Sequence, residues 1–534
     1  MKNIIKTILL SVVVLGMSSC TEEKILDLKP VNNILSPDAF TSPTLIATYM
    51  NGVYNAAAIG QYNAAPTSPN GGRGYVWGAA YVEQGEARGE DVVNMATFYE
   101  LTYKATYDPT TANNVYYWVD GYRLINRCNI MIEGTTEAVA KGVITQAVGN
   151  DYIGQAKFLR AITHLELLTY FAKPYFFTPG ATHPGIPYRE VGVNTSEEIA
   201  TESAKPRNTV AEVYEKVLAD LNSAETLITT GNSTTFTSRV VGRASKWAAI
   251  AFKTRLYLQK RDWANVIFEG NKLTAAFALT ADPYAPFQNT SAVLSSNSES
   301  IFSIQHSAIS NPGVNAALAN ILKDRALVCI SPILWRDKEW LADDKRREDG
   351  KFIYTPKSGI KYTNKYTDVT NKTDAAPIIR YAEVVLNMAE AQARLANPTA
   401  ALTLLNSVRN RSLANPIATP TNPIGQAYTA ASFTTDAALV AAILKERRIE
   451  FLQEGRRWTD IHRLQGDPIA AVATNGIPAK YANGAPAAAA YVLTNSFVVT
   501  TPIAAIPYTS FKFLWPIPQI ELNTNPGLGQ NPDW

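Results

Sequence analysis

Residues 446–463, ERRIEFLQEGRRWTDIHR, constrain the fold more than any other segment of the chain. On a helix, Glu446, Glu450 and Glu454 share one face because they are four residues apart. Stacked carboxylates repel one another unless cations lie between them. The arginines near enough in sequence to supply these cations are Arg447, Arg448, Arg456 and Arg457. The segment therefore predicts an ordered set of ion pairs.

An apolar side of the same helix predicts that part of this charge row is buried. The apolar positions are Val440, Ile443, Leu444, Phe451 and Leu452. Buried ion pairs specify geometry more than they add stability, and removal of one partner costs about 3–5 kcal/mol. We therefore expect ion pairs and apolar contacts together to hold this helix against the body of the protein.

The Glu-Arg-Arg, Glu-Gly-Arg-Arg-Trp and Asp-x-x-Arg elements of this segment resemble the signature of the SusD/RagB family of outer-membrane nutrient-binding lipoproteins. Residues 377–395, PIIRYAEVVLNMAEAQARL, are similar to the helix that precedes this signature in the family, and 400–411, AALTLLNSVRNR, to the helix between them. Residues 515–534, WPIPQIELNTNPGLGQNPDW, resemble the family's C-terminal ending. Residues 155–171 and 243–259 are similar to family helices more loosely.

Helical periodicity predicts a mainly α fold. It occurs at residues 43–57, 114–133, 151–171, 209–227, 243–259, 263–273, 378–395, 399–411 and 436–453. Segments rich in Gly, Pro, Asn, Ser and Thr separate these helices, at 59–113, 176–208, 275–374 and 412–435. We expect these long irregular inserts to form a ligand-binding face on the helical scaffold.

The resemblance implies that the scaffold is tetratricopeptide-like, with about four helix pairs. It covers the chain from about residue 26 to residue 534 and implies a single SusD-like domain over residues 20–534. Within that domain we expect an N-terminal part at about 20–230 and a C-terminal SusD/RagB part at about 240–534.

The first residues are typical of a lipoprotein signal peptide over residues 1–19. Lys2 and Lys6 precede an apolar stretch at 8–16, and small residues lead to Cys20. We expect cleavage before Cys20 and acylation of its thiol and new amine, which would anchor the protein at a membrane. The alternative is an ordinary cleaved signal. The resemblance places the anchored protein in the outer membrane, exposed at the cell surface.

Charge and cysteine usage exclude several classes of protein. Loss of Lys2 and Lys6 with the signal lowers the formal charge from +3 to +1, and a nearly neutral chain without a basic stripe argues against nucleic-acid binding. Cys128 and Cys329 remain, with no zinc-ligand spacing. The sequence alone does not decide whether these two cysteines form a disulfide.

Aromatic residues in the inserts are candidates for glycan recognition. Tyr75, Trp77 and Tyr81 lie in GGRGYVWGAAY, where we expect the glycines to leave the rings room to project, and Trp335 and Trp340 lie in a charged segment. Such rings stack on the C–H face of a sugar while carboxylates and amides bind its hydroxyls. The alternative is that these aromatics belong to the core.

Two charged segments could be simple solvated surface segments. The acidic run Glu83, Glu86, Glu90 and Asp91 contains enough carboxylate oxygens for a structural calcium ion, but it lacks the spacing of a known calcium loop. A solvated acidic loop is the favoured interpretation. Residues 343–347 likewise indicate a solvated mixed-charge segment.

The chain has none of the usual catalytic motifs, and we expect a protein that is not an enzyme and needs no cofactor. The resemblance implies a glycan-binding lipoprotein that captures oligosaccharides or polysaccharides and delivers them to a SusC-like TonB-dependent transporter. Two alternatives remain: a RagB-like protein that binds peptides for uptake, and a surface assembly or adhesion scaffold, since helical-repeat proteins commonly bind other proteins.

Overall fold

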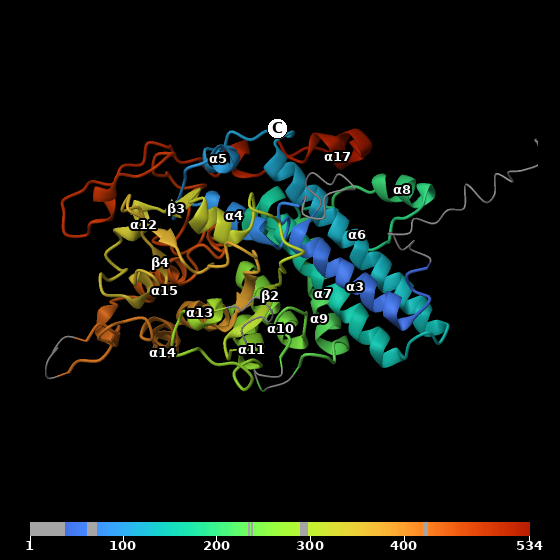
Figure 1. Cartoon of the computed structure of the whole chain (residues 1–534), viewed down its shortest axis with the longest axis horizontal. Helices are drawn as coiled ribbons and strands as arrows, with labels where there is room; N and C mark the ends of the chain where they lie inside the picture. Colours follow the sequence, from blue (N-terminus) through green and yellow to red (C-terminus); the bar gives the residue numbers. More distant parts are fainter. Residues whose placement is uncertain (1–37, 61–71, 233–234, 236–238, 289–296, 420–424) are drawn as a thin grey trace, which may run out of the picture.

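A computed structural model describes residues 38–60, 72–232, 235, 239–288, 297–419 and 425–534 (Figure 1). The expected signal peptide and Cys20 lie outside the described residues. The fold is mainly helical, as the periodicity predicts. None of the described helices is both long enough and apolar enough to cross a bilayer.

The helices of the first half of the chain are α3 (Pro43–Ile59), α4 (Ala79–Ala87), α5 (Thr97–Tyr103), α6 (Ala112–Ala140), α7 (Gln146–Phe171), α8 (Ser196–Ser203), α9 (Val210–Leu227), α10 (Lys246–Gln259) and α11 (Trp263–Asn271). Those of the second half are α12 (Pro332–Trp335), α13 (Tyr381–Arg394), α14 (Pro398–Arg409), α15 (Asp436–Glu450), α16 (Arg457–Arg463) and α17 (Gln519–Thr524). Short strands form antiparallel pairs: β1 (Val92–Asn94) with β3 (Val328–Ile330), β2 (Ser300–Ile304) with β6 (Ala376–Arg380), and β4 (Ile353–Tyr354) with β5 (Tyr362–Thr363).

Local sequence signals set the helix ends. The Ser42 hydroxyl caps α3 directly before Pro43, and Gly60 ends that helix at a φ of 66°. Thr209 and Glu212 form a reciprocal capping box at the start of α9. The predicted helix boundaries at these positions are therefore correct to within a few residues.

Neighbouring helices pack as pairs. Helix α6 packs along α7, and α7 along α9, while α10 contacts both α9 and α11. In the second half, α13 packs against α14 and α15. Figure 1 shows α3, α6 and α7 side by side at one end of the molecule and α13–α15 toward the other. One hydrophobic core contains residues from both halves. That these pairs are tetratricopeptide-like units stays a prediction.

The structure corrects two expectations about the elements. Residues 378–380, predicted as the first turn of a helix, instead end strand β6, because Pro377 and two β-branched isoleucines favour an extended chain that pairs with β2. The insert at 59–113 contains α4, a helix in which every residue is buried. Its neighbouring glycines, which are typical of a loop, conceal it in the sequence.

The carboxylates of Glu446, Glu450 and Glu454 lie in a buried network of ion pairs, as expected, but their cations come from distant segments. Arg346 contacts Glu446 at 2.6 Å and Glu450 at 2.8 Å. Arg380 contacts Glu450 at 2.7 Å and Glu454 at 2.8 Å. The network therefore joins β6 and the 344–347 turn to the end of α15. We call these residues, with Glu299, Lys365, Arg409 and Arg411, the buried charge network.

The arginines adjacent in sequence have other partners. Arg447 pairs with Asp460, Arg448 with Asp91, and Arg456 with Glu383 on α13. Arg457 contacts Glu90. The local pairing predicted from the sequence is therefore wrong, because Glu454 lies in the turn after α15, while these arginines point toward carboxylates of other elements.

Burial and charge act in opposite directions on Glu450. Burial would raise its pKa, but Arg411, Arg380 and Arg346 outweigh this and hold the pKa well below its usual range. The carboxylate is thus ionised and shared among three guanidinium groups.

We predict that Glu450→Gln lowers the free energy of unfolding by about 3–5 kcal/mol, because it leaves buried guanidinium groups without their shared anion. Urea denaturation measures this change. Glu137→Gln removes half of an exposed pair with Lys141 and should cost about 0.3–0.5 kcal/mol. A Glu450→Gln protein as stable as the Glu137→Gln protein would contradict the prediction.

Candidate functional site

The five aromatic residues predicted to bind glycan are all buried. Tyr75, Trp77 and Tyr81 have no exposed surface, while Trp335 and Trp340 are 4% and 2% exposed. None of these rings offers a face to a sugar. The prediction that they form the ligand platform is wrong for this structure, and the alternative of core packing is correct.

The glycines around Tyr75 and Trp77 explain the error. A Cβ on Gly78 would lie 2.1 Å from the carbonyl oxygen of Ala58, so glycine there lets the chain pack directly onto α3. The close approach buries the rings instead of letting them project. The Trp77 Nε1–H then donates to the Thr163 hydroxyl at 2.9 Å, and the Tyr81 hydroxyl accepts a hydrogen bond from Arg456 at 2.6 Å.

Trp335 and Trp340 form a packed cluster of their own. Their ring centroids are 5.4 Å apart, and the Arg347 guanidinium lies 4.4 Å and 4.2 Å from the two centroids. The Trp335 Nε1–H donates to the carbonyl of Tyr491. The expected solvated segment at 343–347 is therefore mostly interior: Asp344, Arg346 and Arg347 are all buried.

The acidic run is also buried, which contradicts the expected solvated loop. Glu90 pairs with Arg448 and Arg457; burial opposes its ionisation, but the two arginines outweigh burial and lower its pKa to about 2. Glu83 and Glu86 face less positive charge, and burial raises the pKa of each to about 8. Within the described residues, no group of His, Cys, Asp or Glu side chains is arranged to hold a metal ion. A calcium site stays untested.

Cys128 and Cys329 are both free thiols in the structure. Burial raises the pKa of each thiol to about 12. The disulfide that the sequence left open is not formed, and both residues behave as small core side chains.

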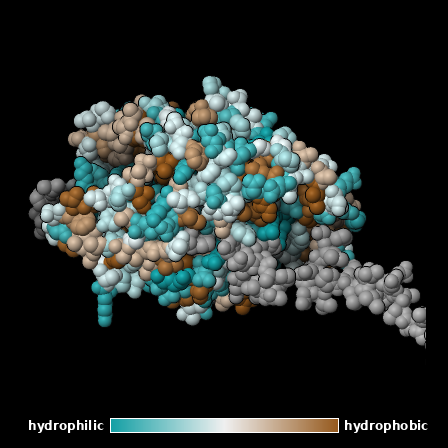
Figure 2. Space-filling model, turned by 90° about the horizontal axis from the view of Figure 1, so that it is seen from above, coloured by the Kyte–Doolittle hydropathy of each residue, from teal (hydrophilic) through white to brown (hydrophobic). Residues whose placement is uncertain are grey.

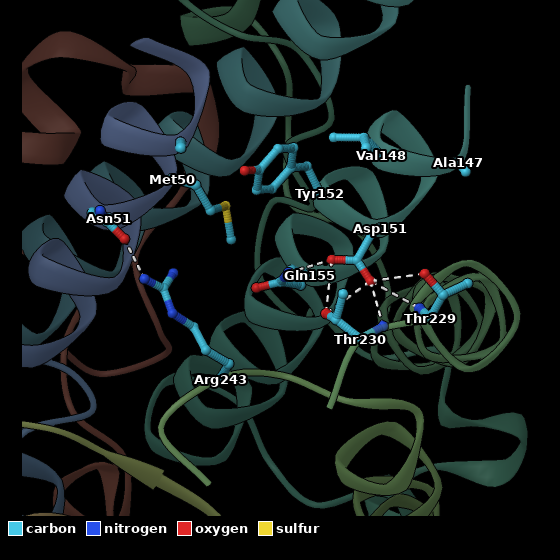
Figure 3. Close-up of a pocket in the computed structure, with 11 residues that line it drawn as sticks. Met50, Asn51, Ala147, Val148, Asp151, Tyr152, Gln155, Thr229, Thr230 and Arg243 are labelled. Carbon is cyan, nitrogen blue, oxygen red and sulfur yellow. Dashed lines mark hydrogen bonds between the residues drawn. The ribbon is translucent and has the colours of Figure 1, made fainter. Parts of the chain in front are cut away.

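A cavity lined by both polar and apolar side chains lies between α3 and α7, and we call it the α3–α7 groove (Figure 3). Its volume is about 510 Å³. Helix α3 supplies Met50 and Asn51, α7 supplies Asp151 and Tyr152, and Arg243 comes from the segment before α10. Thr229 and Thr230, which follow α9, line the same cavity.

Asp151 organises one wall of the groove. Its carboxylate accepts hydrogen bonds from the backbone N–H groups of Thr229 and Thr230, both at 2.8 Å, and from the Gln155 amide at 2.7 Å (Figure 3). These bonds hold the end of α9 against α7. Asp151 therefore positions neighbouring donors and acceptors, and the threonine side chains stay exposed at the rim.

The opposite wall carries a cation that water can reach. The Arg243 guanidinium donates to the Asn51 side-chain oxygen and lies 4.3 Å from the centroid of the Tyr54 ring. The Tyr54 hydroxyl donates to Gln155 at 2.8 Å. These contacts orient Arg243, whose guanidinium lines the groove, and they engage the side-chain oxygen of the buried Gln155.

A smaller cavity of about 210 Å³ continues from the groove and shares Asn51 and Arg243 with it. Asn55 of α3 and Ser310 line this extension, and the Asn55 amide donates to the Ser310 hydroxyl at 2.5 Å. Amide, hydroxyl and guanidinium groups thus line both cavities together with apolar side chains. Such a surface suits a ligand with many hydroxyl groups.

The surface seen in Figure 2 carries small hydrophobic patches scattered among hydrophilic residues. The groove residues did not emerge from the sequence because Asn51, Asp151, Gln155 and Arg243 lie within predicted helical segments or directly beside them. Only their joint position in three dimensions identifies them.

Comparison with known families finds two matches along this chain. Residues 338–534 match the family described as the SusD family, and residues 24–258 match a family described as starch-binding and associating with the outer membrane. Together the two matches span most of the chain. The curated SusD-like protein P2 of Formosa agariphila is 27% identical over 399 residues, which are 65% of this chain and 71% of that protein.

Solved structures show the same fold. A SusD superfamily protein from Bacteroides fragilis is 26% identical, with a TM-score of 0.70 over 92% of this chain and 100% of that one. The surface glycan-binding protein A from Bacteroides fluxus is 19% identical, with a TM-score of 0.62 over 92% of this chain and 100% of that one. The second likeness concerns the fold alone.

The buried acidic run generates a prediction about pH. Glu83 has a folded pKa of about 8 against an ordinary value of 4.5, so its contribution to stability is present below pH 4.5 and is lost as the pH rises to about 8. We expect Glu83→Gln to gain stability relative to the native protein as the pH rises from 4.5 to about 8. Urea denaturation across this range measures the difference.

A carboxylate with a lowered pKa gives stability the opposite pH dependence. Glu90, with a folded pKa of about 2, contributes stability that is lost as the pH falls from 4.5 toward 2. Glu90→Gln should therefore differ most from the native protein at neutral pH. A pH-independent difference between the native protein and Glu83→Gln would contradict the assignment of the raised pKa to Glu83.

Proposed function

The chain belongs to the SusD family, and on this premise we propose that it binds oligosaccharides or polysaccharides in the α3–α7 groove and delivers them to a SusC-like TonB-dependent transporter. The combination of polar and apolar groups in the lining of the groove is the observation that supports this site. Arg243 and Asn51 offer donors and acceptors to hydroxyl groups, while Val148 and Tyr152 offer apolar surface to the ring.

In this proposal the protein binds carbohydrate and does not catalyse a reaction on it. The carboxylate of the groove, Asp151, already accepts hydrogen bonds from two backbone N–H groups and three side chains. These bonds hold the carboxylate in the wall of the groove, where it positions its neighbours. The carboxylates of the buried charge network are paired with arginines in the interior.

Anchoring at the outer membrane through a lipid on Cys20 completes the proposal. The family description of residues 24–258 associates such proteins with the outer membrane. A protein held at the surface beside a transporter would raise the local concentration of its ligand at the entrance of that transporter. A transporter gene beside this one would support the partnership.

We predict that Arg243→Ala lowers affinity for the cognate glycan about ten- to hundredfold, because it removes charge-assisted hydrogen bonds worth about 1.5–3 kcal/mol. Affinity electrophoresis of the soluble form against plant, host and microbial polysaccharides identifies the glycan, and calorimetry then measures the affinity. Asn51→Ala should weaken binding in the same direction.

Lys357→Ala is the matched control, since Lys357 is exposed and lines neither part of the groove. It should leave affinity unchanged. Glycan binding that survives Arg243→Ala and Asn51→Ala together would place the site elsewhere. No binding to any polysaccharide would favour a peptide ligand.

For the anchor, we predict that Cys20→Ser abolishes labelling by radioactive palmitate and releases the protein from the membrane fraction. Globomycin should cause the precursor of the native protein to accumulate. Cys329→Ser is the control, because Cys329 is buried in the core and not a site of acylation. Labelling that persists in Cys20→Ser would contradict the proposed anchor.

A further inference from the structure

A second cavity lies where the chain after α7 meets the C-terminal segment, and we call it the C-terminal cavity. Its volume is about 420 Å³. The residues that matter for its chemistry are Lys173, Phe177, Arg207, Tyr508, Phe511 and Asp533. The cavity shares no residue with the α3–α7 groove or its extension.

Aromatic rings stand at the opening of this cavity. Phe177 and Phe511 are 48% and 37% exposed, unlike the buried aromatics predicted from the sequence. The Tyr508 ring packs edge-on against Phe177, with centroids 6.0 Å apart. Exposed rings around a cavity provide faces on which the C–H surface of a sugar can stack.

Two cations in the wall have carbonyl partners in place of carboxylates. Lys173 Nζ donates to the Tyr508 carbonyl at 2.6 Å, and Arg207 Nε donates to the Gly185 carbonyl at 2.7 Å. Burial lowers the pKa of Lys173 to about 8 and that of Arg207 to about 10. No ion pair between either cation and a carboxylate is present in the part of the chain that the structure describes.

The hydroxyl group of Tyr508 is a third potential donor at this cavity. The Tyr508 hydroxyl oxygen is buried and has no hydrogen-bond partner among the described residues. A buried polar atom without a partner costs free energy unless a ligand or water satisfies it. Two cations and one free hydroxyl around a single cavity complement a negatively charged group.

We propose that the C-terminal cavity is a second carbohydrate site, which binds an acidic sugar bearing a carboxylate or a sulfate ester. Lys173, Arg207 and Tyr508 bind the anionic group, and Phe177 and Phe511 contact the ring. Asp533, at the rim, accepts hydrogen bonds from sugar hydroxyls and disfavours a second negative charge there. The inference rests on the proposed function, because it takes carbohydrate as the ligand class, but it concerns a different cavity.

Ligand-observed NMR of the soluble form tests the site with small probes. The acidic probes are galacturonic acid and galactose 6-sulfate, and galactose is the neutral match. We expect saturation transfer to both acidic sugars and little to galactose. The two acidic probes distinguish a carboxylate from a sulfate as the preferred group.

Variants assign the binding to the cavity. Lys173→Gln and Arg207→Gln should each weaken binding of the preferred acidic sugar about tenfold or more. Phe511→Ala, at an exposed position, should weaken it without loss of the fold. Lys216→Gln is the matched control, because Lys216 is an exposed cation outside both cavities that pairs with Glu190. Unfolding midpoints check that each variant is folded.

The outcomes separate this inference from the proposed function. Equal binding of acidic and neutral sugars, or acidic binding unaffected by Lys173→Gln, Arg207→Gln and Phe511→Ala, would overturn the acidic-sugar site alone. Absence of binding to the acidic probes would also overturn it, even when neutral glycans bind at the α3–α7 groove. Failure of every carbohydrate, small or polymeric, would overturn both.

Discussion

The contact of Arg380 with Glu299, Glu450 and Glu454 is the interaction on which the second half of the protein depends. Arg380 lies at the junction of β6 and α13, so its guanidinium connects the β2–β6 sheet to the end of α15. Burying this many charges is costly, and the ion pairs compensate the cost only when every partner is in place. The network thus specifies one arrangement of these elements more strongly than it stabilises that arrangement.

The polar stripe of α13 extends this principle. Glu383 pairs with Arg255 of α10, and Glu390 pairs with Arg463 of α16. A helix that presents such a stripe to its neighbours can pack correctly in only one register, since a shift by one turn would leave charges without partners. Because the interior fixes the scaffold in this way, the cavities at the surface can differ in chemistry without altering the fold.

Sequence reasoning located most of the scaffold and none of the candidate site. The helical segments at 43–57, 209–227 and 436–453 carry strong periodicity and clear caps, so their positions follow from local signals. The pairing of Glu450 with Arg346 and Arg380 does not follow, because many arginines compete for each carboxylate and only the tertiary fold selects among them. Helix α4 was not predicted, because its neighbouring glycines are typical of a loop. In the structure these glycines allow the close approach that buries the helix.

The aromatic residues show why composition identifies a ligand class more readily than a site. Trp77 and Phe511 are equally plausible stacking surfaces by residue type, yet the first has no exposed surface and the second is 37% exposed. The difference lies in what each segment packs against, and no property of a single residue encodes it. The cations differ in the same way. Arg346 is neutralised by Asp344, Glu446 and Glu450, whereas Lys173 and Arg207 donate to carbonyl oxygens and Lys173 also lies over aromatic rings. A pair of cations without carboxylate partners beside exposed rings is therefore a stronger indication of a binding site than the abundance of tyrosine and tryptophan, because no ion pair among the described residues balances their charge.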